Sequence, residues 1–171
     1  TICKNIFNEF NNEKVNYCHW KSNEHLIEGL NGITDLDLLV SNDHQKKFSA
    51  ILKNNNCILV SPQYGARYPK VEEWVGYDGE TGKLIHLHVH YRMITGTKHV
   101  KEYTLPWDAL ALDTRVLHET GTVYIMQPHL ELVVLYTRMV LKERQIIGKM
   151  DKFEIARDYR KEIQWLKERI N

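Results

Sequence analysis

Two spacings of apolar residues alternate along the first sixty positions, one typical of helices and the other of strands. Apolar residues three and four apart, together with polar caps, predict helices over Lys4–Glu13, over Glu24–Leu30 and from Ser41 to about Asn54. Short apolar runs predict strands at Val15–Trp20, Asp35–Val40 and Cys57–Val60. This alternation indicates a sheet with helices packed against it.

Two hairpins are predicted in the next seventy residues. The strands of the first run over Val71–Tyr77 and Lys83–Arg92, around a loop with two glycines. Those of the second run over Thr114–His118 and Thr122–Met126. The pattern therefore predicts an α/β (α+β) fold, with a mixed sheet that is mainly antiparallel at its edges.

Two long helices close the sequence. The first runs from Pro128 to about Ile147, and its spacing leads us to expect Tyr136, Met139 and Val140 in the core. The second begins at Asp151 and continues to Ile170 with apolar residues three and four apart. These helices predict a C-terminal helical unit beside the sheet.

The change from a mixed pattern to a helical one suggests two parts. Residues 1–127 form the predicted α/β core, and residues 128–171 form the predicted helical unit. Because the apolar stripe of the last helix continues to the end of the sequence, we expect a longer protein with an additional domain after Asn171.

Composition narrows the function classes. The 171 residues can bury a core without disulfides or metals. With 23 basic and 22 acidic residues the net charge is +1, which argues against binding long nucleic acid through bulk charge. We expect no membrane contact, because no apolar run reaches the length of about 18 residues that a span needs. A polar N-terminus and three widely spaced cysteines favour a cytoplasmic protein.

The segment Trp20–Val40 carries the most informative chemistry. It holds a strand end, a turn with Lys21 and Ser22, a short helix, and then Asp35 and Asp37 at the start of a strand. Residues two apart on a strand point to the same face, so both carboxylates project together. Two such carboxylates repel each other unless a cation lies between them, and Mg²⁺ prefers oxygen ligands. The pair therefore predicts a metal site.

This segment resembles the signature of the nucleotidyltransferase superfamily, which includes polymerase-beta-like and aminoglycoside-modifying enzymes. That signature is a Gly-Ser-type turn, a short helix and an Asp-x-Asp pair about a dozen residues later, and here Ser22 precedes Asp35 by thirteen positions. The resemblance implies that Ser22 and the adjacent backbone amides hold the triphosphate of a nucleoside triphosphate. It also implies that Asp35 and Asp37 bind Mg²⁺, and that the sheet is of the nucleotidyltransferase type.

Two positions depart from the family pattern. Lys21 stands where the family has glycine, and its ammonium could meet a phosphate directly. The family also places a third acid on a later strand, where this sequence offers His86, His88 and His90. We align His88 with that position, and His86 next. A neutral imidazole can act as general base, and it is a better ligand for Mn²⁺, Zn²⁺ or iron than for Mg²⁺.

The His-x-His-x-His run also has interpretations of its own. On a strand the three rings share one face at a spacing of ~6.5 Å, so two of them with Asp35 or Asp37 could form a metal site for hydrolysis. A half-exposed strand whose outer face happens to carry histidines explains the same run without any ligand.

The sequence thus predicts a metal-dependent nucleotidyltransferase-like enzyme. Asp35, Asp37 and His88 are its catalytic candidates, and Asp35, Asp37, His88 and His86 are its metal ligands. Lys21 and Ser22 are expected to hold the nucleoside triphosphate, and the acceptor is expected to be a small molecule. Two alternatives stay open: a catalytically degenerate nucleotide-binding or interaction module, and a His/Asp metal-dependent phosphohydrolase.

Overall fold

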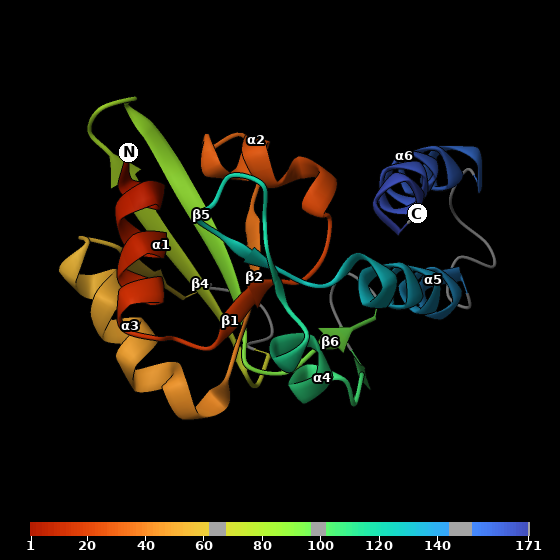
Figure 1. Ribbon diagram of the computed structural model, residues 1–171, viewed down its shortest axis with the longest axis horizontal. Helices are drawn as coiled ribbons and strands as arrows, with labels where there is room; N and C mark the ends of the chain where they lie inside the picture. The colour runs from red at the N-terminus through yellow and green to blue at the C-terminus, as the bar shows by residue number, and fades with distance from the viewer. Residues whose placement is uncertain (62–67, 97–101, 144–151, 171) are drawn as a thin grey trace.

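A seven-stranded mixed sheet forms the centre of the structure, a computed structural model that describes residues 1–61, 68–96, 102–143 and 152–170 (Figure 1). In spatial order its strands are β3 (Ile58–Val60), β4 (Val71–Asp78), β5 (Lys83–His90), β2 (Leu36–Val40), β1 (Tyr17–His19), β9 (Tyr124–Ile125) and β8 (Val116–Leu117). A second, two-stranded sheet pairs β6 (Ile94–Thr95) with β7 (Tyr103–Thr104). The α+β class and the antiparallel edges are confirmed.

The pairing of the central strands sets which side chains meet. β2 lies between β1, with which it pairs antiparallel, and β5, with which it pairs parallel. β5 pairs antiparallel with β4 through the predicted hairpin. In this register Asp37 on β2 lies opposite His88 on β5, and His88 lies opposite Glu73 on β4. Three polar residues from three neighbouring strands therefore share one face.

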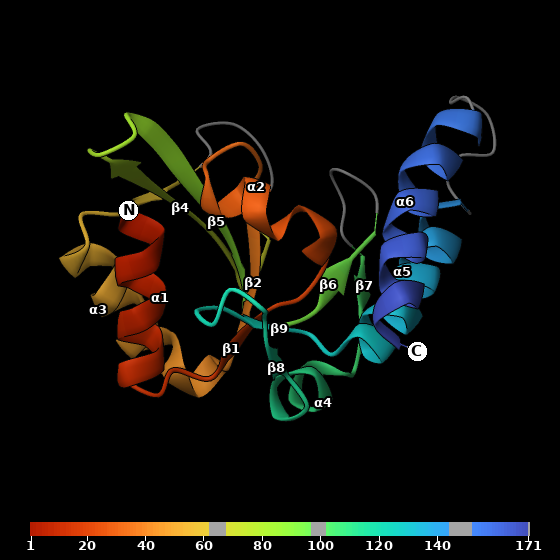
Figure 2. The same cartoon turned by 45° about the horizontal axis from the view of Figure 1, so that its top comes forward.

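The first face of the sheet is covered by helices from the N-terminal part of the chain. α1 (Ile2–Asn12) and α3 (Gln45–Asn54) lie side by side in both views, and Leu26 of α2 (Leu26–Leu30) joins the same cluster (Figures 1 and 2). Phe10 of α1 stacks on Phe48 of α3 with ring centroids 4.7 Å apart. The buried residues of this cluster also include Ile6, Phe7, Tyr17, Leu36, Leu38, Leu52, Trp74, Ile85 and Leu87.

The second face carries a smaller core beside its polar residues. α4 (Asp108–Asp113) and the start of α5 (Pro128–Glu143) cover the β1 side of this face, and α6 (Lys152–Ile170) runs alongside α5 (Figure 2). The buried residues of this cluster are Cys18, Trp20, Leu39, Met93, Leu105, Ala111, Leu112, Met126 and Val134. Because these residues cover only the β1 side of the second face, the part of that face formed by β4 and β5 can carry polar side chains.

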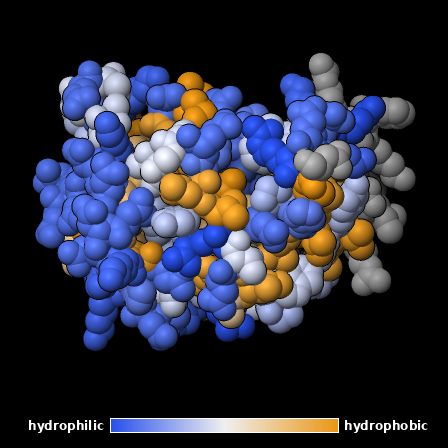
Figure 3. All heavy atoms as spheres, in the orientation of Figure 1, coloured by the Kyte–Doolittle hydropathy of each residue, from blue (hydrophilic) through white to orange (hydrophobic). Residues whose placement is uncertain are grey.

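Helix α5 turns a different side to the sheet than its apolar spacing predicted. Tyr136 is 45% exposed and Val140 is 58% exposed, so their expected place in the core is wrong, while Met139 is half-buried. The buried side of α5 comprises Glu131, Val134, Leu135 and Arg138. Two of these four are charged, so a pattern of apolar residues could not identify this side. Figure 3 shows apolar surface residues over α4 and α5, and others in the centre of the same face and near α2.

Most predicted elements are present with shorter ends. The first hairpin, the helix ending at Asn54 and both C-terminal helices occur as expected, whereas α4 and the β6–β7 pair were not predicted. The predicted boundaries at Ile147 and Asp151 lie outside the described residues. The division at residue 127 stays a prediction. In the described part of the chain no helix is both long and apolar enough to cross a membrane.

Candidate functional site

A chain of hydrogen bonds crosses the second face of the sheet from β2 to β4. His88 donates through Nδ1 to Asp37 Oδ1 at 2.9 Å, and its Nε2 lies 3.2 Å from Glu73 Oε1. The parallel β2–β5 register and the antiparallel β4–β5 register place these three residues directly beside one another. His88 and Asp37 are mostly buried, with side chains 14% and 15% exposed. The imidazole is thus held between two carboxylates.

A second chain runs parallel to the first, one step along β5. His86 bonds through Nδ1 to Asp35 Oδ1 and through Nε2 to Glu73 Oε2, each at 2.7 Å. The hydrogen bond to Glu73 is the main cause that raises the pKa of His86 to about 9, and the Asp35 carboxylate adds to it. His86 is therefore an imidazolium at neutral pH. Asp35 with His86 and Asp37 with His88 thus form two adjacent pairs that Glu73 joins, while their roles as ligands and catalytic groups stay predictions.

Glu73 is the residue of this site that sequence reasoning missed. It joins both histidines from β4, a strand whose chemistry the Asp-x-Asp signature does not mention. A signal was present in the predicted hairpin. Pairing its strands outward from the loop at Asp78 and Lys83 sets Glu73 opposite His88.

Lys21 contacts Asp37 at the β2 end of the first series of hydrogen bonds. Its ammonium lies 2.7 Å from Asp37 Oδ1, and only 17% of its side chain is exposed. Burial alone would raise the pKa of Asp37, but Lys21 and His88 outweigh it and hold that pKa well below its usual range. Lys21, expected at a phosphate, is thus in contact with one of the predicted metal ligands.

Three of the polar side chains meet the distance requirement of a metal site. Ligand atoms of Asp37, His88 and His90 all lie within 4.8 Å of one another. His90 is fully buried, and its ring packs edge-on against Trp20 with centroids 5.1 Å apart. Asp35 and His86 fall outside this group among the described residues. The geometry adds His90 to the candidate ligands and sets Asp35 and His86 beside them.

Glutamates of the C-terminal helices accept hydrogen bonds from the backbone of the Ser22 turn. Ser22 has a left-handed backbone, with φ at +57°, and its N–H points to Glu162 Oε1 at 3.3 Å. The next residue, Asn23, donates its N–H to Glu131 Oε1 at 3.0 Å and its Nδ2 to Glu131 Oε2 at 2.6 Å. The backbone amides expected at a triphosphate therefore contact glutamates from α5 and α6.

These glutamates form a second acidic group with Glu24. Ligand atoms of Glu24, Glu131 and Glu162 lie within 4.8 Å of one another. Burial is the main cause that raises the pKa of Glu131 to about 8 and that of Glu24 to about 7, and the Glu162 carboxylate adds to both. Both groups thus hold a proton for part of the time at neutral pH, which lowers the repulsion among them.

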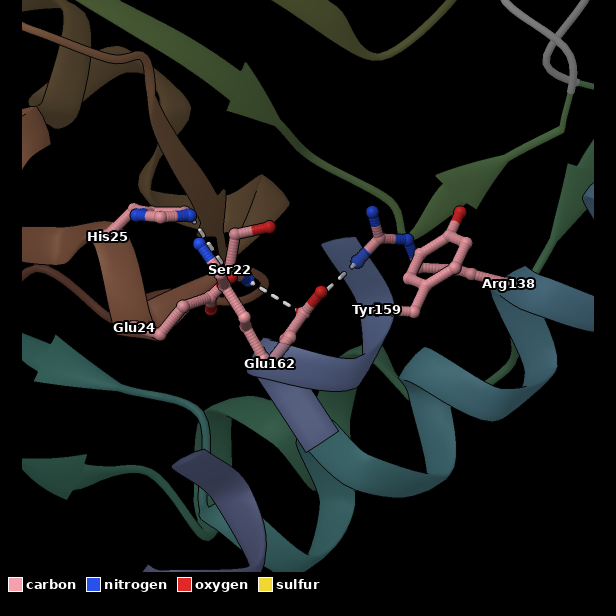
Figure 4. Close-up of a pocket in the computed structure, with 7 residues that line it drawn as sticks. Ser22, Glu24, His25, Arg138, Tyr159 and Glu162 are labelled. Carbon is pink, nitrogen blue, oxygen red and sulfur yellow. Dashed lines mark hydrogen bonds and ion pairs between the residues drawn. The ribbon is translucent and has the colours of Figure 1, made fainter. Parts of the chain in front are cut away.

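A cavity of about 480 Å³ opens beside this turn (Figure 4). It is lined by Ser22, Glu24, His25, Arg138, Tyr159, Lys161 and Glu162. The cavity thus lies between the predicted phosphate turn and the two C-terminal helices. Comparisons with protein-family models, curated proteins and solved structures gave no match for this chain.

Proposed function

We propose that this protein is a metal-dependent nucleotidyltransferase-like enzyme that transfers a nucleotidyl group from a nucleoside triphosphate to a small-molecule acceptor. The observation that carries the proposal is the pairing of Asp37 on β2 with His88 on the parallel neighbour β5. It joins a strand-borne acid of the Asp-x-Asp pair to the residue that aligns with the third acid of the superfamily.

The donor atoms favour a transition metal. Asp37 offers a carboxylate oxygen, and His88 and His90 offer imidazole nitrogens, a set that suits Mn²⁺, Zn²⁺ or Fe²⁺ better than Mg²⁺. A bound divalent cation would polarise phosphoryl oxygens of the triphosphate. In this proposal Asp35 and His86, next along the same face, complete the charged surroundings, and Mg²⁺ remains the alternative that the Asp-x-Asp pair implies.

The proposed roles of the other residues follow from their places. Lys21 follows β1 and stands between Asp37 and the Ser22 turn, so its ammonium can contact a phosphate placed there. Ser22 offers its hydroxyl and its N–H to the same phosphate. His88 donates through Nδ1 to Asp37, so its Nε2 would exchange its contact with Glu73 for one of two roles, to ligate the metal or to accept the proton of the acceptor hydroxyl.

One observation favours a second candidate, a degenerate nucleotide-binding or interaction module. The N–H groups of Ser22 and Asn23 already contact Glu162 and Glu131, and negative charge beside the turn opposes a triphosphate. The two-histidine donor set favours the remaining alternative, a His/Asp metal-dependent phosphohydrolase, in which water replaces the acceptor.

The test begins with the metal content of protein purified without added metal, followed by titration with Mn²⁺, Zn²⁺ and Mg²⁺. We expect one divalent cation per chain, with affinity at least tenfold lower in Asp37→Asn and His88→Ala. His129→Ala, an exposed position outside the site, serves as the matched control and should bind as the wild type does.

Turnover then separates the three candidates. Release of pyrophosphate from a nucleoside triphosphate that depends on an acceptor, and that is lost in Asp37→Asn, supports the transferase. Nucleotide binding without turnover across a panel of sugars, amines and antibiotics refutes the enzyme in favour of the module. Hydrolysis of phosphate esters without an acceptor refutes it in favour of the phosphohydrolase.

A further inference from the structure

Arg138 is an unusual buried cation at the wall of the cavity. The residue is 9% exposed, and among the described residues its Nη1 has no hydrogen-bond partner. Its guanidinium lines the cavity and points toward Glu162 (Figure 4). A buried donor without a hydrogen bond is costly, so such a group calls for an acceptor supplied from the cavity.

Glu162 occupies the place where such an acceptor would lie. Its Oε1 is 3.3 Å from the N–H of Ser22 and 3.9 Å from Arg138 Nη1, so two donors converge on one oxygen. Figure 4 shows these donors on opposite sides of the carboxylate. Both distances are long for charge-assisted hydrogen bonds, which are about 2.7–2.9 Å. Glu162 thus satisfies the two donors incompletely.

Cations and carboxylates share the wall of the cavity. Arg138 and Lys161 contribute two positive charges, and His25 adds a ring nitrogen that can donate. The carboxylates on the wall are Glu162 and Glu24, and the raised pKa of Glu24 reduces its charge near neutral pH. The donors come from three separate elements, which suits a tetrahedral oxyanion better than a planar carboxylate.

We propose that this cavity binds a phosphate group through Arg138, Lys161 and the backbone N–H of Ser22, in competition with the carboxylate of Glu162. The site deepens the proposed function, on which it rests for the choice of phosphate as the anion. It assigns the C-terminal helices α5 and α6 a direct part in holding the substrate. Glu162 then acts as an internal competitor that a phosphorylated ligand displaces.

The probe is inorganic pyrophosphate, titrated by calorimetry in a buffer with a chelator and no divalent cation. We expect Arg138→Lys to bind at least tenfold more weakly and Lys161→Gln about threefold more weakly, since each removes a donor or a charge. Glu162→Gln should bind at least threefold more tightly, because it removes the competing charge and keeps the size. Lys167→Gln, an exposed lysine of the same helix outside the cavity, should bind as the wild type does.

Pyrophosphate affinity should fall in Arg138→Lys and rise in Glu162→Gln, and these opposite changes distinguish anion binding from a structural role of Arg138. If Arg138→Lys fails to fold, which circular dichroism would show, Glu162→Gln and Lys161→Gln still decide the question. No binding by the wild type, equal binding in Glu162→Gln, or equal losses in Lys161→Gln and Lys167→Gln would overturn the proposal. Acetate that binds as tightly as pyrophosphate would overturn the choice of phosphate.

The metal-free buffer separates this proposal from the proposed function. If pyrophosphate fails to bind while metal-dependent turnover is observed, only the anion site is refuted. If pyrophosphate binds as expected while turnover is absent, the cavity stands and the enzymatic proposal falls.

Discussion

The ion pair between Lys21 and Asp37 offers the most direct test of the electrostatics of the site. The two charges lie 2.7 Å apart with only 17% and 15% of their side chains exposed, and Asp37 also accepts from His88 at 2.9 Å. We consider Asp37→Asn, Lys21→Met and the double variant, all measured with a chelator present. The two single variants differ in which charge they leave without its partner.

Asp37→Asn leaves the Lys21 ammonium facing an amide that cannot compensate its charge, and it removes the carboxylate that accepts from His88. Breaking one partner of a buried pair costs about 3–5 kcal/mol, which we reduce to about 2–4 kcal/mol because solvent reaches one sixth of these side chains. Lys21→Met costs less, about 1–2 kcal/mol, because His88 still pairs with the carboxylate. The double variant should lose less than the sum, with a coupling energy of about 1–2 kcal/mol.

Urea unfolding of the four proteins measures these free energies. The exposed pair Lys47–Glu13, whose charges lie 3.9 Å apart, is the matched control, and its cycle should show little coupling. Additive effects of Lys21→Met and Asp37→Asn would refute the reasoning, since they would mean that the two side chains do not interact in solution.

Three further predictions concern the buried glutamate and the packing. Because the pKa of Glu131 is raised to about 8 in the folded state, the native carboxyl holds a proton that the unfolded chain has lost, and the free energy of unfolding falls as pH rises from about 4.5 to 8. Glu131→Gln should flatten that fall in urea unfolding measured from pH 5 to 8. An unchanged slope would contradict the raised pKa of Glu131. Gly32 has φ at +66°, and a Cβ there would lie 2.7 Å from a backbone oxygen of β5, so Gly32→Ala should cost about 2–3 kcal/mol in thermal unfolding. Gly82→Ala has the same backbone strain and open space around it, and should cost about 1 kcal/mol; equal losses would show that contact plays no part. On α5, Val134→Ser should lower the melting temperature clearly and the exposed Val140→Ser should not, as differential scanning fluorimetry would reveal.

Strand periodicity was the strongest guide to the site. Because side chains two apart share a face, the sequence could place Asp35 and Asp37 together and His86 and His88 together before any coordinates were known. The resemblance to nucleotidyltransferases added the expectation that His88 stands at the position of the family's third acid, which stays a prediction. The predicted residues do lie in contact, although their metal and catalytic roles stay predictions.

Partners supplied by distant segments were beyond such reasoning. Glu131 and Glu162 reach the Ser22 turn across 108 and 140 positions of the chain, and no local pattern ties them to it. The buried side of α5 was missed for a related reason, since it includes Glu131 and Arg138 in place of apolar residues. Burial of a charged side chain depends on what packs opposite it.

The sequence by itself determined most of the helices and strands, and it placed Asp35 with Asp37 and His86 with His88 on strand faces, because dihedral preferences and side-chain alternation act over a few residues. Tertiary structure alone decided that Lys21 pairs with Asp37, that Glu73 bridges two histidines, and that glutamates from α5 and α6 meet the Ser22 turn. These contacts depend on strand order and helix docking, which are set by the packing of the whole chain.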